Sequence, residues 1–501
     1  MINSPNLIPM FTALPLAAAF LTSLLARRSK ILADLFAVLT TLALFIFSLA
    51  GLRLVNLYGV LVYHLGGWKI PLGIGLVLDG LSAFMLVTVN LVAFLVVIFA
   101  VDYMRKFTAK WKFYCLFLLM LAGMNGVVVA GDMFNLFVFL EIAAVASYAL
   151  VAFGTERHEL EAAFKYAIMS TVGSSFILLA IVMLYSYTST LNMADMGMIL
   201  VQKGLGNLGT MVSVLLIMGF GLKAALVPFH AWLPDAHPSA PAPISAMLSG
   251  VLIKSLGIYS LCRILYNVIG ITPQSSSILM FLGTLSMIVG VILAIGQWDL
   301  KRLLAYHSIS QIGYVVLGIG LGTPLGIFAG LFHLFNHSVF KSLLFLNSGA
   351  LEYATGTRDL QKMGGLAEKM PVTYRTNLVA SMSIAGIPPF NGFWSKLLII
   401  FAAVQAEKFA YAFWAVLASL LTLASFTKVL KYAFSGGISQ GLSTVKSAPL
   451  WMKLSMITLA LICLTGGLLL APRAAYIFLQ QPTDVLLKGV EYAPAILEGA
   501  K

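Results

Sequence analysis

The chain has 501 residues, of which 60% are hydrophobic and only 10% are charged, and its mean hydropathy is +0.98. Such a composition excludes a string of soluble domains and indicates an integral membrane protein. The 31 lysines and arginines exceed the 18 acidic residues, a balance that positively charged cytoplasmic loops explain better than nucleic-acid binding does. The three cysteines lie far apart without ligand spacing, so we expect no disulfide, no metal site and no redox cofactor.

Apolar stretches of the length needed to cross a bilayer, about 20 residues, recur along the whole chain. In chain order the predicted spans are 7–26, 31–51, 74–100, 112–131, 133–153, 163–186, 209–227, 243–269, 276–298, 302–322, 325–350, 376–405, 408–434 and 450–472. Basic residues follow the first stretch instead of preceding it, which favours a retained helix over a cleaved signal peptide. The expected fold is an all-α membrane protein with about fourteen transmembrane helices.

Lysine and arginine residues crowd every second connection between these spans. The basic groups are Arg27, Arg28 and Lys30; Arg105, Lys106, Lys110 and Lys112; Arg157; Lys301 and Arg302; Arg358, Lys362, Lys369 and Arg375; and Lys446 and Lys453. Because cytoplasmic loops carry such an excess, these connections should face the inside. With an even number of spans, both termini should then lie outside.

Ionisable side chains inside the apolar spans are informative, because each costs at least a few kcal/mol at the bilayer centre. These residues are Asp79, Glu141, Lys165, Lys223, Lys254, Arg263, His307, His333, His337, Lys341, Lys396 and Lys428. Asp79 opens its span and is expected to cap a helix N-terminus. The other residues are candidates for an ion path through the membrane.

Three pairs of these lysines recur at a nearly constant separation. Lys165 and Lys341 are 176 residues apart, Lys223 and Lys396 are 173 apart, and Lys254 and Lys428 are 174 apart. This offset equals five predicted spans. Since five is odd, the two copies should be inverted in the membrane, as in many ion-coupled transporters. Chance alignment of three lysine pairs is the alternative.

The repeat divides the chain into four parts. We expect helices 1–3 in residues 1–111, a first five-helix repeat (helices 4–8) in 112–275, a second, inverted repeat (helices 9–13) in 276–434, and helix 14 with a tail in 435–501. Prolines lie beside two of the paired lysines: Pro228 follows Lys223, and Pro388 and Pro389 precede Lys396. Because proline removes a backbone donor and interrupts a helix, we predict that helices 7 and 12 are broken there.

Glu141 is the one carboxylate within the fifth span, and the matching position of the second copy is Leu317. A buried glutamate and a buried lysine shift each other's proton affinity, so a Glu141–Lys223 ion pair would exchange protons near neutral pH. The alternative is a static ion pair that holds two helices together.

Five further titratable residues would extend this pair into a proton relay: Lys254, His307, His337, Lys341 and Lys396. For each of them, a satisfied polar residue in a crowded bundle is the alternative. His333 and His337 also have the spacing of metal ligands on one helix, but no cysteine or acid nearby completes a ligand set. We therefore predict no metal, cofactor-binding or catalytic residues.

Several long motifs resemble those of one family. They are the stretch from Lys223 to His237 (KAALVPFHAWLPDAH) with Ala240–Ser245, the stretch Asp299–Ser308 (DLKRLLAYHS), and Gly386–Phe393 (GIPPFNGF). The pattern is similar to that of the antiporter-like, proton-conducting membrane subunits of respiratory complex I, membrane-bound hydrogenases and Mrp-type sodium/proton antiporters. The resemblance covers residues 74–434, and Tyr185–Asp195 looks most like the D-type chain of Mrp antiporters and its hydrogenase counterparts.

The resemblance implies roles for four residues. The family's glutamate of the fifth helix falls on Glu141, its broken-helix lysine on Lys223, its lysine of the eighth helix on Lys254, and its ionisable residue of the broken twelfth helix on Lys396. A lysine at 396 is unlike the complex I subunit type that carries glutamate there. His307 occupies a position at which many relatives have a small hydroxyl residue.

From this resemblance we expect an ion-translocating subunit that moves protons, sodium ions or both in a multi-subunit complex of a prokaryotic cell membrane. An Mrp-type antiporter or a membrane-bound hydrogenase-like assembly is favoured over a quinone-reducing complex I-type subunit. The partners would be other antiporter-like and small membrane subunits, lipid and, in an oxidoreductase complex, a peripheral redox module, with no catalytic redox site in this chain. A stand-alone solute transporter has little support because polar groups other than titratable ones are scarce. A non-conducting scaffold would have no need of costly buried charges.

Overall fold

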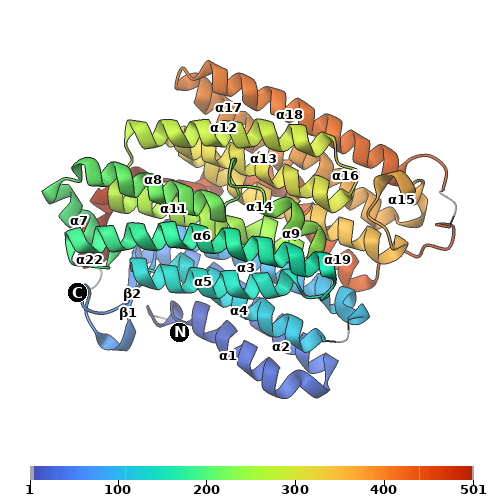
Figure 1. Cartoon of the computed structure of the whole chain (residues 1–501), viewed down its shortest axis with the longest axis horizontal. Helices are drawn as coiled ribbons and strands as arrows, with labels where there is room; N and C mark the ends of the chain where they lie inside the picture. Colours follow the sequence, from blue (N-terminus) through green and yellow to red (C-terminus); the bar gives the residue numbers. More distant parts are fainter. Residues whose placement is uncertain (1–4, 108, 439–440, 499–501) are drawn as a thin grey trace.

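Long helices that lie side by side make up most of the chain (Figure 1). The computed structural model describes residues 5–107, 109–438 and 441–498. Within these residues, twelve helical segments are long and apolar enough to cross a membrane, so the chain is a mostly helical multi-pass membrane protein. Eleven of them contain α1 (Met10–Leu25), α2 (Lys30–Tyr58), α3 (Gly80–Tyr103), α4 (Lys110–Val129), α5 (Met133–Val151), α6 (Arg157–Thr188), α8 (Gly206–Lys223), α12 (Pro273–Ile295), α13 (Leu300–Gly320), α18 (Phe409–Val429) and α19 (Leu450–Thr465).

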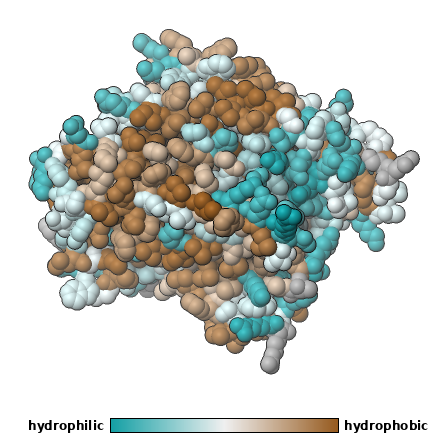
Figure 2. Space-filling model, in the orientation of Figure 1, coloured by the Kyte–Doolittle hydropathy of each residue, from teal (hydrophilic) through white to brown (hydrophobic). Residues whose placement is uncertain are grey.

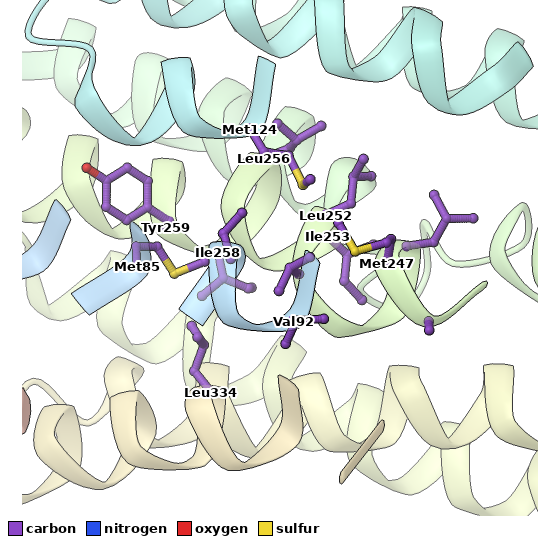
Figure 3. Close-up of a cluster of buried hydrophobic side chains, with 14 of the residues drawn as sticks. Met85, Val92, Met124, Met247, Leu252, Ile253, Leu256, Ile258, Tyr259 and Leu334 are labelled. Atoms are coloured by element: carbon purple, nitrogen blue, oxygen red, sulfur yellow. The ribbon is translucent and has the colours of Figure 1, made fainter. Parts of the chain in front are cut away.

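The twelfth segment, Ala242–Ile269, is continuous but partly π-helical. It comprises α10 (Ala242–Met247), η5 (Leu248–Tyr259), α11 (Ser260–Ile264) and η6 (Leu265–Ile269), and all of its residues are buried. Figure 3 shows its apolar side chains beside Val92 of α3, Met124 of α4 and Leu334 of α14 (Pro324–Thr355). A helix that is apolar on every side must be surrounded by other helices, so this segment forms the centre of the bundle.

Three further helical regions complete the bundle. α14 has 32 residues, and α16 (Pro371–Ala385) and α17 (Asn391–Gln405) have 15 residues each and are separated by five residues. None of these helices is among the twelve apolar segments, because α14 contains buried histidine and lysine residues and α16 and α17 are each short. The shorter elements are α7 (Met193–Lys203), α9 (Leu233–Ser239) and α15 (Leu366–Lys369).

A β-hairpin precedes α3, and its second strand occupies residues that the sequence assigned to the third span. β1 (Leu61–His64) pairs antiparallel with β2 (Gly75–Leu78), so the span expected to start at residue 74 starts at Gly80 instead. The Asp79 carboxylate accepts a hydrogen bond from the backbone N–H of Ser82 at 2.8 Å. This bond confirms the predicted N-terminal cap.

The C-terminal region packs onto the bundle instead of forming the expected tail. It contains α20 (Pro472–Ala475), α21 (Gln481–Leu487) and α22 (Ala493–Glu498). The Asn267 side chain donates hydrogen bonds to the carbonyl oxygens of Val485 and Gly489 at 2.7 and 2.9 Å. Four residues earlier, Arg263 binds both carboxylate oxygens of Asp79 at 2.7 and 2.8 Å. These contacts join the C-terminal region, the central segment and the start of α3.

Both ends of the chain lie toward the end of the bundle that carries the β-hairpin, and α15 lies toward the opposite end (Figure 1). Figure 2 shows apolar side chains over most of one flank, with hydrophilic side chains gathered toward the end of α15. This distribution is typical of a membrane protein whose flank meets lipid and whose ends meet water.

Candidate functional site

A first polar cluster joins α5, α6 and α8. Glu141 lies in α5 and Lys223 is the last residue of α8, and Lys223 Nζ lies 3.4 Å from Glu141 Oε1. Two hydroxyl groups of α6 complete the cluster: Ser170 accepts a hydrogen bond from Lys223 at 2.5 Å, and Ser174 donates one to Glu141. An acid and an amine linked through hydroxyl groups can hold and exchange a proton.

The chain leaves helical geometry directly after Lys223. Turns follow until α9 begins at Leu233, and Pro228 lies among them. The indole N–H of Trp232 donates to the carbonyl oxygen of Leu222 at 3.1 Å. The same oxygen accepts a hydrogen bond from the backbone N–H of Ala225 at 3.1 Å, so the lysine lies at a helix terminus that hydrogen bonds stabilise.

Lys254 lies in the π-helical η5, at the centre of the bundle, and its side chain is fully buried. Its ammonium group donates hydrogen bonds to the carbonyl oxygens of Ser249 and Gly250, both at 2.6 Å. The Ser249 hydroxyl lies 2.6 Å from that of Ser308 on α13. Within the described chain no carboxylate pairs with Lys254, so carbonyl dipoles take the place of a counter-ion.

α14 adds further buried titratable groups beside Lys254. Both ring nitrogens of His337 and the Nζ atom of Lys341 lack a hydrogen-bond partner among the described residues. His337 and Lys341 lie on α14, which packs both on η5, the segment that carries Lys254, and on α17, the helix that carries Lys396. The structure therefore packs together the helices that carry these four predicted relay residues.

Two other histidines bond to serine hydroxyl groups on neighbouring helices. His307 Nε2 lies 2.8 Å from Ser425 Oγ on α18, and His333 Nδ1 lies 2.9 Å from Ser395 Oγ on α17. The second of these serines directly precedes Lys396, so His333 reaches the same part of α17 as that lysine.

Lys396 lies in the second turn of α17. Its ammonium group donates to the carbonyl oxygen of Ile384 at 2.7 Å and to the Ser419 hydroxyl at 3.3 Å, and it lies 4.7 Å from the centre of the Tyr314 ring. A cation next to the last carbonyl groups of α16 is favoured by the helix dipole. The aromatic face adds a cation–π attraction.

The interval between α16 and α17 contains Pro388 and Pro389 and begins with Gly386. Gly386 has φ of 80°, and a Cβ added to it would lie 3.0 Å from Lys396 Cδ. Glycine is therefore required both by the backbone conformation and by the close approach of the lysine side chain.

The serines that bind the first ion pair and an asparagine pair between two helices were not predicted from the sequence. Ser170 binds Lys223 and Ser174 binds Glu141, and the Asn391 amide donates to Asn336 Oδ1 at 3.0 Å across α17 and α14. Serine and asparagine are too common to attract notice by type. The signal that could have found the serines is their spacing of four residues, which places both on one face of α6.

His237, the last residue of the first quoted motif, is fully buried and stacks on Phe345 at 4.7 Å. Both of its ring nitrogens lack a hydrogen-bond partner among the described residues. A polar cavity of about 490 Å³ adjoins the residues that follow it and is lined in part by Lys301 and Glu352, which form an ion pair at 3.0 Å. This cavity could admit water toward His237.

Two lysines that the sequence places inside spans, Lys165 and Lys428, lie in apolar segments of membrane-spanning length, but their side chains are exposed or partly exposed on the single chain. Lys165 is 49% exposed and pairs with Glu161 and Asp235 at 2.8 and 3.1 Å. Lys428 is partly exposed and donates to backbone carbonyl groups at the end of α12. It lies near the end of α18, where a long side chain can extend its charge to polar surroundings.

The described residues contain no group of three or more histidine, cysteine, aspartate or glutamate side chains placed to hold a metal ion. The rings of His333 and His337 have centroids 6.3 Å apart. The first of these rings bonds to a serine.

Comparison with known proteins relates the chain to membrane subunits of two kinds of complex. Residues 130–422 match the family model for NADH:quinone oxidoreductase/Mrp antiporter, transmembrane, and residues 65–114 match that for the N-terminus of complex I chain 5. The chain is 36% identical over 399 residues to the D-type chain of the Na(+)/H(+) antiporter of Alkalihalophilus pseudofirmus, across 78% of this chain and 81% of that protein. It is 38% identical over 383 residues to the N-type chain of the NADH-quinone oxidoreductase of Desulforudis audaxviator, across 75% and 76%.

Two solved structures share the fold over 99% of this chain and 100% of their own. One is a chain of the Mrp complex from Dietzia sp. DQ12-45-1b, with a TM-score of 0.89 and 28% identity. The other belongs to the membrane-bound sulfane sulfur reductase, an archaeal respiratory membrane complex, with a TM-score of 0.88 and 29% identity.

Proposed function

The chain belongs to the NADH:quinone oxidoreductase/Mrp antiporter family of membrane subunits, and from this premise we propose that it conducts protons as the D-type chain of an Mrp-like Na⁺/H⁺ antiporter. It is an ion-translocating subunit that works beside other membrane subunits in the cell membrane. The observation that carries the proposal is the row of titratable groups from Glu141 to Lys396, in which Glu141, Lys254 and Lys396 each bond to a hydroxyl or carbonyl oxygen.

Proton exchange begins at the Glu141–Lys223 pair. The Lys223 side chain is 3% exposed, but that of Glu141 is 32% exposed on the flank of the single chain. A carboxylate at this depth is costly against lipid, so a neighbouring subunit or water covers it in the assembled complex. Protonation of Glu141 removes the counter-charge of Lys223 and thereby favours release of the lysine proton.

The helix break after Lys223 connects this pair to the centre of the bundle. Gly257, three residues after Lys254, lies so close to Ala224 that an added Cβ would be 2.6 Å from the Ala224 Cβ. The backbone that follows Lys223 therefore packs directly on the helix that carries Lys254. A change of charge at one lysine alters the electrostatic potential at the other, because charges interact strongly where water is scarce.

Internal water would carry the proton onward. The buried side chains of His337, Lys341 and Gln311 all have polar atoms without a hydrogen-bond partner among the described residues. Buried polar groups are nearly always hydrogen-bonded, and internal water serves where protein offers no partner. Lys396, next to the interval between α16 and α17, is the last group and passes the proton toward the end of the bundle that carries the termini.

The proposal includes a topology. The twelve apolar segments, α14 and the pair α16–α17 make fourteen crossings, with inverted repeats in 112–275 and 276–434, helices broken at Pro228 and at Pro388–Pro389, and both termini outside. The distribution of basic residues and the similar placement of Lys223 and Lys396 beside proline-containing intervals support it. Cysteines introduced at Arg27 and Arg358 should be labelled from the inside only, and one at Lys488 from the outside only. Labelling of position 358 from outside would contradict the inverted repeat.

A redox-driven complex is the second candidate. The similarity to a chain of an NADH-quinone oxidoreductase and the likeness to the sulfane sulfur reductase favour it. Purification of the native assembly separates the two candidates: flavin or iron–sulfur subunits that co-purify indicate a redox complex, and small membrane subunits alone indicate an antiporter.

Replacement of either residue of the Glu141–Lys223 pair tests the proposed function. Glu141→Ala or Lys223→Ala leaves an unpaired charge, which costs about 3–5 kcal/mol where it is fully buried. We expect each variant to abolish sodium-dependent proton movement in membrane vesicles while the complex still assembles. Glu161→Ala, which removes an exposed acid of α6, is the matched control. Near-normal transport by either pair variant would refute the assignment.

A further inference from the structure

An apolar groove opens on the flank of the bundle, and no step of proton transfer uses it. Its volume is about 600 Å³, within the range of about 300–1,000 Å³ that is usual for ligand sites. Leu49 and Leu52 of α2 form one wall, and Leu468 and Leu469, which follow α19, form the other. Phe335 of α14 lies against it from the interior of the bundle.

The lining offers a ligand almost no polar group. Thr465 has the one polar side chain among the lining residues, and its hydroxyl donates to the Leu461 carbonyl oxygen within α19. Leu468, at the groove, is 71% exposed. Since α2, α3 and α19 belong to apolar segments that cross the membrane, the groove meets hydrocarbon chains and not water.

Two arginines are sequence neighbours of residues that line the groove. Arg53 directly follows Leu52 near the end of α2, and Arg473 directly precedes Ala474, a lining residue in α20. Both are exposed, and neither forms an ion pair or hydrogen bond with another described residue. A hydrogen bond of 2.7 Å from Gln481 to Asn56 joins the last turn of α2 to α21, which holds the two edges of the groove at the same end of the bundle.

We propose that this groove binds one anionic phospholipid, with a hydrocarbon chain along the groove and the phosphate between Arg53 and Arg473. Guanidinium groups bind phosphate oxygens in bidentate fashion, and long basic side chains near a helix end extend toward the headgroup layer. Basic residues beside membrane helices attract anionic lipids in general. The combination of an apolar groove and two unpaired arginines selects a lipid with net negative charge over a zwitterionic one.

The bound chain would also support α14. Phe335 precedes Asn336, whose side chain donates to the Asn391 carbonyl oxygen at the start of α17 at 3.1 Å. A hydrocarbon chain packed on Phe335 therefore lies one residue from the contact that joins α14 to the second broken helix. This site is independent of the proposed proton path, because none of its residues titrates in that path.

Native mass spectrometry of the purified assembly tests the headgroup contact. After exchange into phosphatidylglycerol or phosphatidylcholine, we expect one phosphatidylglycerol retained per copy of this chain, at least about tenfold more than phosphatidylcholine. The double variant Arg53→Gln/Arg473→Gln should lose that preference, whereas Arg375→Gln, at an exposed arginine of α16 that does not line the groove, should keep it. Equal retention of the two lipids by the unmodified assembly, or an unchanged preference in the double variant, would overturn the proposal.

The hydrocarbon contact is tested separately. Leu468→Trp fills the mouth of the groove and should lower phosphatidylglycerol retention, and Leu454→Trp, at a 45% exposed leucine of α19 outside the groove, should not. A photoreactive residue at Leu469 should cross-link to lipid. Cross-linking to another protein subunit instead would show that the groove is a subunit interface and would overturn the proposal.

Discussion

Lys223, at the end of α8, and Lys396, near the start of α17, are held in opposite ways. Lys223 faces the Glu141 carboxylate at 3.4 Å. Lys396 has no carboxylate partner among the described residues and is held by the Ile384 carbonyl oxygen and the Tyr314 ring. The two lysines recur at a regular spacing in the sequence, but the groups that bind them differ. One lysine depends on a titratable partner, whereas fixed dipoles stabilise the other, so they should respond differently to the same substitution.

The largest difference is expected when each lysine is replaced by glutamate. Lys223→Glu places a second carboxylate beside Glu141, and the repulsion should lower transport by at least about tenfold. Lys396→Glu has no acid beside it, and its protonated form can donate to the Ile384 carbonyl oxygen, so partial transport should remain. Proton flux in vesicles measures both variants. Equal activity of the two would remove the distinction between the sites.

Removal of the charge of Lys396 should separate proton uptake from proton release. Lys396→Ala should block transfer across the membrane, because the group proposed to release the proton is lost, while Glu141 still exchanges protons with the inner side. Infrared difference spectra of oriented membranes would follow the Glu141 carboxyl band after a pH jump on that side. A Glu141 band that responds only to the outer side, or intact transport in Lys396→Ala, would contradict the proposed direction.

Backbone substitutions at the two breaks should act in opposite directions. Gly386→Ala puts a Cβ at φ of 80° and 3.0 Å from Lys396 Cδ, and we expect a loss of stability of about 1–2 kcal/mol. Ala225, in the first break, already has φ of 56°, so Ala225→Gly should relieve strain and raise stability by a smaller amount, about 1 kcal/mol. Thermal unfolding of the purified complex in detergent should show a lower midpoint for the first variant and a higher one for the second, and an unchanged or lower midpoint for Ala225→Gly would contradict the second prediction.

The smallest effect is expected at Lys165, which shares its spacing but not its surroundings with the fully buried Lys341. Its ion pairs with Glu161 and Asp235 are exposed to solvent, and such pairs contribute little. Lys165→Ala should therefore transport protons at the rate of the unmodified protein. A marked loss of flux would contradict this prediction and would give Lys165 a role in transport.

Much of the site could be predicted from residue type alone. A lysine or glutamate in an apolar span is rare enough to stand out, which is why Glu141, Lys223, Lys254 and Lys396 were found without coordinates. The partners were not found, because Ser170, Ser174 and Asn336 belong to residue types that occur in any helix. The predicted third span also begins too early, because its first residues form strand β2, which hydropathy does not distinguish from helix.

The sequence by itself determined that the chain is a multi-pass helical membrane protein and which charged residues enter its apolar segments, because hydropathy and charge are properties of residues in order along the chain. Only the tertiary structure decided which helices lie beside one another. It placed Ser170 beside Lys223 and Ser174 beside Glu141, exposed Lys165 while burying Lys341, and closed the C-terminal region onto the central segment. The physical reason is that periodicity shows which residues share a face of one helix, whereas the neighbour that the face meets depends on how all the helices pack together.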